Sequence, residues 1–271
     1  MPPKGKAKAG KPPHPPSHAH QTHHTTQSTP PRPNWPLLTP IVPSTDLTLH
    51  PLLEDQILLI PNFFTATLCK TYVTYLSGLP LTTTPGKPKR GEAVRVNDRF
   101  QIEDAGFARR LWEDTSLADL VTGYHPALGP EKGGDAVEQG NESKNIWGGQ
   151  VLGLNPNIRI YRYRPGQFFD KHYDESNRLV LETSNPSGVK SKIPAKTTWT
   201  LLIYLSRSEG GETVFYPEGP RKGPTPDAVV ARVEPGMALL HRHGEECLLH
   251  EGREVLSGEK WVLRSDLVVR R

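Results

Sequence analysis

From Gln150 onward the chain alternates short apolar runs with turn residues, and this pattern limits the possible folds more than any other feature. The turns contain Pro165-Gly166, Gly210-Gly211 and Pro235-Gly236. Many short strands with regular turn signals are typical of a β-sandwich or a β-barrel. We therefore predict strands over residues 151–154, 158–163, 198–205, 213–216, 229–233, 237–240, 246–250 and 260–269.

Two helical patterns precede these strands. Thr65 is a suitable N-cap for a helix that ends near Ser77, and a second helix is expected over residues 105–121. Because helices come first and strands later, the expected class is α+β, with N-terminal helices packed on a β core. The expected domain covers residues 46–271, with helical support over 54–121, an insertion loop over 122–149 and the core over 150–271.

Residues 1–45 are rich in proline, lysine and histidine and contain almost no aliphatic side chain before Leu37. Such a segment cannot bury enough apolar surface to offset its ordering entropy, so we predict a disordered tail. The tail carries five basic residues and no acidic one, whereas the whole chain has a net charge of +4. The domain itself is therefore close to neutral, which argues against nucleic acid as its partner.

The two cysteines, Cys69 and Cys247, are too few for a disulfide framework and are expected to be packed thiols. No apolar run approaches the ~18 residues of a membrane helix, and the N-terminus lacks the apolar region of a secretory signal. We therefore expect an intracellular protein, cytoplasmic or nuclear, that has no membrane partner.

His172 and Asp174 are metal-type ligands one residue apart, within the stretch 155–176. In a strand, residues i and i+2 project to the same face, so the imidazole and the carboxylate would enter one space. A second histidine there would complete a two-histidine, one-carboxylate face on a metal ion, with the opposite positions open. The motif alone is a weak signal, because short motifs recur by chance.

Residues 237–250 offer three histidines as the third ligand: His241, His243 and His250. We favour His250, because it follows an apolar strand and precedes a turn, so a buried strand would deliver it to the site. His241 and His243 are alternatives, or ordinary histidines at a strand edge.

Two cations lie on one face of the last predicted strand, Lys260 and Arg264. A buried cation needs an anion. The anion is either the carboxylate of a dicarboxylate cosubstrate or an ordinary salt-bridge partner such as Asp266 or Glu259.

Together, His172-x-Asp174, His250 and the Lys260-Trp261 pair ten residues later resemble the Fe(II)/2-oxoglutarate-dependent dioxygenases. The nearest likeness is the prolyl 4-hydroxylase type, in its intracellular fungal or plant form. The resemblance covers residues 54–271 and includes Y-x-P-G-Q-x-F at 163–169, I-Y-L-S and G-G-E-T-x-F within 203–215, and L-I-P-N-F-F at 59–64.

The resemblance implies a double-stranded β-helix, or jelly roll, as the core. It also implies Fe(II) bound by the two histidines and the aspartate, and 2-oxoglutarate paired through its distal carboxylate with Lys260, or with Arg264. Tyr163 and Tyr204 match positions that hydrogen-bond the cosubstrate, and each is equally a candidate core tyrosine. Ascorbate would be a further cofactor.

Such an enzyme uses O₂ to hydroxylate a side chain, and the resemblance points to a prolyl side chain in a protein or peptide, with release of succinate and CO₂. Leu202, Leu249 and Val262 are expected to wall a dry pocket, and the loops 122–149 and 179–196 are candidate lids. Three alternatives stay open: a cupin-type metal-dependent hydrolase or isomerase, a nucleic-acid demethylase of the same superfamily, and a non-catalytic binding module.

Overall fold

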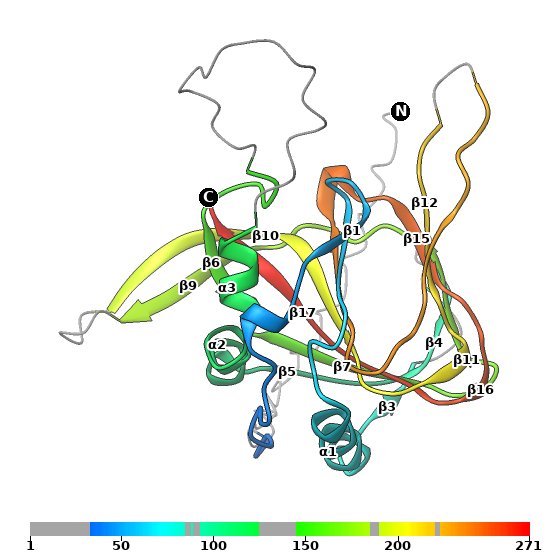
Figure 1. Cartoon of the computed structure of the whole chain (residues 1–271), viewed down its shortest axis with the longest axis horizontal. Coiled ribbons are helices and arrows are strands. Elements are labelled where there is room, and N and C mark those ends of the chain that lie inside the picture. The colour runs from blue at the N-terminus through cyan, green and yellow to red at the C-terminus, as the bar shows by residue number, and fades with distance from the viewer. Residues whose placement is uncertain (1–32, 85–87, 89–92, 125–144, 185–189, 220–222) are drawn as a thin grey trace, which may run out of the picture. The chain divides into compact units, whose positions relative to one another are not determined.

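The computed structural model describes residues 33–84, 88, 93–124, 145–184, 190–219 and 223–271, and Figure 1 labels its elements. The first 32 residues of the predicted tail and residues 125–144 of the predicted insertion loop lie outside the described residues. No helix in the described part of the chain is long and apolar enough to cross a membrane.

Strands dominate the described residues. Their bounds are β1 His50–Leu53, β2 Ile57–Ile60, β3 Thr82–Thr83, β4 Arg95–Val96, β5 Asp98–Glu103, β6 Val151–Leu154, β7 Asn157–Tyr163, β8 Phe168–His172, β9 Arg178–Ser184, β10 Lys190–Tyr204, β11 Ser208–Gly210, β12 Thr213–Tyr216, β13 Val229–Ala231, β14 Ala238–Arg242, β15 Leu249–Gly252, β16 Val255–Gly258 and β17 Lys260–Arg270. The larger sheet has the order β1-β2-β14-β10-β17-β7-β5-β3, with β6 on β17 and β9 on β10. A second sheet has the order β13-β12-β15-β8-β4, and β11 pairs with β16.

The chain passes back and forth between the two main sheets. Strands β7, β10, β14 and β17 belong to the larger sheet, whereas β8, β12, β13 and β15 belong to the second. This alternation is that of a jelly roll, so the predicted α+β class with a jelly-roll core is confirmed. The predicted strand over 246–250 begins only at Leu249, because Gly244–Glu246 form a short 3₁₀ helix, η2.

The first helix, α1 Ala66–Ser77, begins where the sequence predicted, and the Thr65 hydroxyl accepts a hydrogen bond from the Leu68 amide at 3.1 Å. The single helix predicted over 105–121 is wrong, because the structure has α2 Ala105–Glu113 and α3 Leu117–Thr122 instead. The Thr115 hydroxyl donates to the Leu111 carbonyl at 2.7 Å and accepts from the Leu117 amide at 3.3 Å. These side-chain bonds compete with the backbone ladder and divide the helix.

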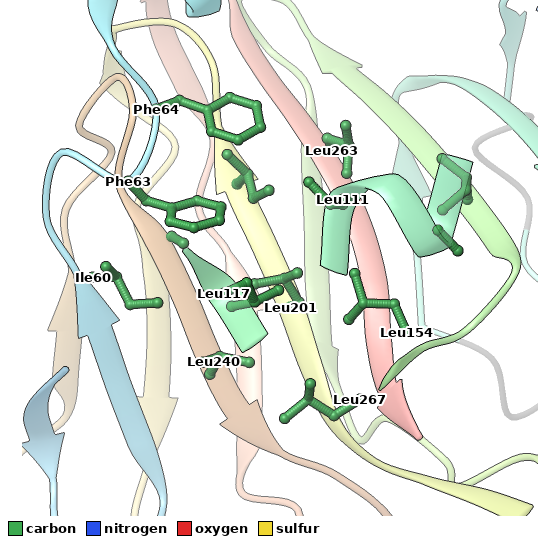
Figure 2. Close-up of a cluster of buried hydrophobic side chains, with 14 of the residues drawn as sticks. Ile60, Phe63, Phe64, Leu111, Leu117, Leu154, Leu201, Leu240, Leu263 and Leu267 are labelled. Atoms are coloured by element: carbon green, nitrogen blue, oxygen red, sulfur yellow. The ribbon is translucent and has the colours of Figure 1, made fainter. Parts of the chain in front are cut away.

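The two faces of the larger sheet have different partners. On one face, leucines of β10, β14 and β17 pack against helical and loop side chains, as Figure 2 shows for Leu201, Leu240, Leu263, Leu267, Leu111, Leu117, Phe63 and Phe64. Alternate residues of β17 point the other way, so Lys260, Val262 and Arg264 line a pocket between the sheets. The alternation of side chains along β17 thus directs one set into the hydrophobic core and the other set into the pocket.

Residues 33–45, which the composition assigned to the tail, pack on the domain. The ring of Trp35 stacks on Phe107 at a centroid distance of 4.2 Å, and its Nε1 donates to Asp104 at 2.9 Å. Leu38 is buried, and Ser44–Asp46 form a 3₁₀ helix, η1. The few apolar side chains of this segment are enough to anchor it, which is why average composition placed the boundary too late.

Replacing Trp35 by alanine should therefore lower the free energy of unfolding by about 3–5 kcal/mol, as expected for a buried aromatic residue. Leu37 is the matched control: it is 72% exposed, and its alanine variant should change the stability by less than about 0.5 kcal/mol. Urea unfolding followed by circular dichroism measures both. Equal, small losses in the two variants would contradict the docking of this segment.

The expected polar loop over 179–196 is instead an antiparallel hairpin of β9 and the first part of β10 (Figure 1). Leu181 lies opposite Ile193, and Arg178 lies opposite Lys196. Leu179 and Leu181 pair with Ala195 and Ile193, so one face of the hairpin is aliphatic, and the lysines and the proline obscured that period in the sequence. The residues of its tip, 185–189, lie outside the described part of the chain.

Candidate metal centre

Three candidate ligands meet between the sheets. His172 is the last residue of β8, and His250 on β15 lies directly opposite it in the antiparallel register. Asp174 follows β8 by two residues, and its Oδ1 lies 3.6 Å from His172 Nε2 while its Oδ2 lies 3.8 Å from His250 Nε2. Strand pairing therefore joins residues that are far apart in the sequence.

Backbone carbonyls orient both imidazoles. The Nδ1 of His172 lies 2.8 Å from the Asp170 carbonyl oxygen, and the Nδ1 of His250 lies 2.9 Å from that of Leu248. A carbonyl oxygen only accepts, so each Nδ1 carries the proton and each Nε2 offers its lone pair to the site. Burial lowers the pKa of His172 to about 4 and also lowers the pKa of His250, so both rings are neutral near pH 7.

These donors fit a divalent metal ion. Two donor atoms that share an ion at about 2.0–2.2 Å lie roughly 3 Å apart at right angles and about 4 Å apart when opposite. The separations of 3.6 and 3.8 Å fall in this range, and all three donor atoms lie within 4.8 Å of one another. Two histidines and one carboxylate form the face that non-haem Fe(II) prefers.

His241 also reaches this centre, which the sequence pattern did not favour. It lies on β14, it is buried, and its Nε2 is 3.7 Å from Asp174 Oδ2. With Cys247 and His250 it forms a second group of potential ligand atoms within 4.8 Å of one another. His241 is therefore the structural rival of His250 as the third ligand, and no feature of its local sequence distinguishes it from an edge histidine.

His243, the remaining candidate, is an internally bonded histidine. Its Nδ1 lies 3.0 Å from the Thr200 hydroxyl, and its Nε2 lies 2.9 Å from the Thr197 hydroxyl. Both cysteines are free and buried, as expected. Burial raises the pKa of the Cys247 thiol to about 11, so it stays protonated near pH 7.

Asp174 is held by a positive neighbour. Two nitrogens of the Arg264 guanidinium face its two carboxylate oxygens at 2.9 and 3.3 Å, and the Thr200 hydroxyl donates to Oδ2 at 2.9 Å. Burial, the largest single effect, would raise the pKa of Asp174, but Arg264 and the neighbouring histidines together outweigh it and hold the pKa well below the usual range. Arg264 also lies 3.5 Å from Asp266, so it has the salt-bridge partner considered from the sequence.

Lys260 has a different environment. Its buried Nζ donates to the Gly211 carbonyl at 2.6 Å and lies 3.5 Å from the Thr213 hydroxyl, over the rings of Tyr163 and Tyr204. Within the described residues, no carboxylate forms an ion pair with it. Burial lowers its pKa from 10.5 to about 7. Lys260 is thus a buried amine that an incoming anion would stabilise in its charged form.

The candidate ligands and Lys260 line one pocket of about 440 Å³. Tyr163, Leu202 and Val262 are among its walls, as predicted, whereas Leu249 is not in its lining. Tyr204 contributes indirectly, because its hydroxyl bonds to that of Thr213 at 2.7 Å, and Thr213 faces the pocket. Aliphatic and aromatic walls around a few polar groups are typical of a small-molecule site.

Comparison with known families agrees with this site. Residues 158–265 match the family model described as the 2OG-Fe(II) oxygenase superfamily. The matched segment contains His172, Asp174, His250 and Lys260, the residues on which the resemblance seen in the sequence rests. Over 119 residues the chain is 30% identical to prolyl 4-hydroxylase 1 of Arabidopsis thaliana. That match covers 38% of each protein, so it spans well under half of the length of this relative.

Solved structures of low sequence identity are also similar to this chain. A prolyl 4-hydroxylase from Pseudomonas putida is 13% identical with a TM-score of 0.48, covering 80% of this chain and 94% of its own. The viral collagen prolyl hydroxylase of Paramecium bursaria Chlorella virus-1, solved with 2OG, is 17% identical with a TM-score of 0.43, covering 79% and 96%.

Proposed function

We propose that this chain is an Fe(II)- and 2-oxoglutarate-dependent dioxygenase that hydroxylates a side chain of a protein or peptide, with prolyl as the first side chain to test. The observation that carries the proposal is that one pocket holds both a two-histidine, one-carboxylate face and a buried amine that forms no ion pair within the described residues. The first fits Fe(II), and the second fits the distal carboxylate of a dicarboxylate cosubstrate.

Each group has a defined task. His172, Asp174 and His250 would hold the iron through three positions and leave the others for the keto acid and O₂. Bound iron supplies the activation of O₂, which the enzyme couples to conversion of 2-oxoglutarate into succinate and CO₂. Lys260 would orient the cosubstrate, while Leu202 and Val262 keep water away from it.

The pocket favours this function over the alternatives. A cupin-type hydrolase would use the same three ligands, but it has no need for a buried amine beside them. A binding module has no need for two neutral imidazoles aimed at one carboxylate. The choice of a prolyl substrate rests on the similarity to the plant prolyl 4-hydroxylase. Ascorbate as a cofactor and an intracellular location are predictions from the sequence.

Anaerobic addition of Fe(II) and 2-oxoglutarate to the purified protein tests the proposal. A keto acid chelated to Fe(II) gives a visible charge-transfer band, so we expect such a band that saturates near one equivalent of each. Succinate lacks the keto group, and Zn(II) has no transferable d electron, so neither substitution should give the band. Absence of the band with Fe(II) and 2-oxoglutarate together would overturn the assignment.

Arg264 should act as a positioning residue for Asp174 under this proposal. Leucine at position 264 should weaken metal binding about 10- to 100-fold, as for other residues that orient a ligand, and lysine should restore part of the loss. Loss of the six-line electron paramagnetic resonance signal of free Mn(II) measures the binding. Arg162→Leu is the matched control, because it removes an arginine that pairs with Asp98 and does not line the pocket.

The opposite outcome is also informative. Normal Mn(II) binding by Arg264→Leu, together with a large loss of 2-oxoglutarate affinity, would make Arg264 the anchor of the cosubstrate in place of Lys260.

A further inference from the structure

A second, larger hollow lies beside the metal centre, over the middle of β10 and the ends of β14 and β17. Its volume is about 1350 Å³, including the part open to solvent. Its lining comes from these three strands, from β9, from the segments that follow β8, β14 and β17, and from the segment that precedes β6: Ile146, Trp147, Gly148, Ser176, Arg178, Lys196, Thr197, Thr198, Trp199, Arg242, His243, Gly244, Glu245, Glu246, Arg270 and Arg271. We call this hollow the basic groove.

Positive charge predominates in the basic groove. Arg178, Lys196 and Arg270 form no ion pair within the described residues, and they come from three different strands, β9, β10 and β17. Arg242 and Glu246 pair with each other, so their charges cancel locally. Glu245 is the other carboxylate of the lining, and it is exposed. The groove therefore has unpaired cations in excess of unpaired acids.

The strand register brings two of these cations together. Arg178 lies directly opposite Lys196 across β9 and β10, and Arg270 lies opposite Ala195 across β10 and β17. Like charges on directly opposite residues of an antiparallel pair destabilise it. An anionic ligand over Arg178 and Lys196 would remove that cost, so this pair points to an acidic occupant, and Arg270 adds a third positive charge to the same lining.

The groove borders the loop that carries a candidate metal ligand. The Gly244 amide donates to the Asp174 carbonyl at 2.8 Å, and Ser176 follows that aspartate by two residues. Gly244 has a φ of +78°, and a Cβ there would lie 3.1 Å from the Cβ of Ser176. Two residues of the groove lining therefore lie against the loop of Asp174, which places the groove next to the candidate metal centre.

We propose that the basic groove binds an acidic segment of the peptide substrate, rich in aspartate or glutamate, that flanks the residue to be hydroxylated. This inference rests on the proposed function and names the class of its substrate. A nucleic acid fits the groove less well, because single strands bind by stacking their bases on exposed aromatic rings. Trp147 and Trp199, the aromatic side chains of the lining, are both buried and pack against each other at 5.1 Å.

Three fluorescein-labelled peptides test the groove by fluorescence anisotropy. Each carries one central proline, flanked by aspartate and glutamate, by serine and glutamine, or by lysine. The acidic peptide should bind at least about tenfold more tightly than the neutral one, with an affinity that falls as salt rises. The charge-reversal variant Arg178→Glu/Arg270→Glu should weaken it roughly tenfold. Lys70→Glu/Arg207→Glu makes the same change in net charge outside the groove and should leave binding unchanged.

Anisotropy needs neither iron nor turnover, so it separates this inference from the proposed function. If the Fe(II) and 2-oxoglutarate band forms but the acidic and neutral peptides bind equally, the groove proposal fails and the dioxygenase assignment stands. If the acidic peptide binds through Arg178 and Arg270 but the band is absent, the assignment fails and the groove stands. Tighter binding of a single-stranded oligonucleotide through the same two arginines would overturn the acidic-peptide proposal.

Discussion

Alanine in place of His172 or His250 should each weaken Mn(II) binding by more than about 100-fold, which is the upper end of the loss seen when only a supporting residue is removed. Each substitution takes away one of three protein donors, and water is a poor replacement in a buried pocket with apolar walls. The signal of free Mn(II) in electron paramagnetic resonance spectra measures the affinity without reference to turnover. The Fe(II) and 2-oxoglutarate band should disappear in both variants.

The two neighbouring histidines provide matched controls for this experiment. His243→Gln should keep full metal affinity, because both ring nitrogens of His243 bond to threonines. His241→Ala decides between the two possible third ligands. If His250 is the ligand, His241→Ala should reduce the metal affinity only modestly. Loss of binding in His241→Ala, with binding retained in His250→Ala, would transfer the role to His241.

The β core could be predicted from the strand and turn pattern because local signals agreed with the global fold, whereas the jelly roll was implied by the family resemblance. Each strand of the core has its own apolar run, and glycine or proline marks most of the turns between them. The predictions of the second helix and of the tail boundary were wrong, because in each place one side chain has more effect than the average composition around it. Thr115 divides the second helix through its own hydrogen bonds, and Trp35 docks a segment whose composition resembles a tail.

The site could be predicted in part for a similar reason. His172 and Asp174 lie close in sequence, and the residues around His250 and Lys260 carry a family pattern. What the sequence could not supply is the pairing across strands. That Arg264 faces Asp174 depends on how β17 lies against the end of β8, and His241 approaches the same carboxylate from β14. The basic groove likewise depends on β9, β10 and β17 lying side by side in the sheet.

Methionine in place of Lys260 should weaken 2-oxoglutarate binding by about 3 kcal/mol, or roughly 150-fold, because the cosubstrate carboxylate would then be buried without a cation. Metal affinity should be unchanged, since Lys260 is not among the candidate ligands. Isothermal titration of the Mn(II)-loaded protein with 2-oxoglutarate measures the effect. Lys192→Met on the β9–β10 hairpin removes an exposed lysine and should have no effect. Unaltered affinity in Lys260→Met would remove this residue from the cosubstrate site.

The pH dependence of 2-oxoglutarate binding tests independently whether Lys260 holds the cosubstrate carboxylate. Without its ligand, Lys260 has a pKa of about 7, below its ordinary value of 10.5. A bound carboxylate stabilises the ammonium form of Lys260. Above about pH 7 the free amine is mostly neutral, so the binding of 2-oxoglutarate must be accompanied by protonation of Lys260. The affinity for 2-oxoglutarate should therefore fall as pH rises through this region, approaching tenfold per pH unit. Arginine keeps its charge throughout this range, so Lys260→Arg should abolish that slope even if its absolute affinity is lower. A slope that persists in Lys260→Arg would assign the proton to another group.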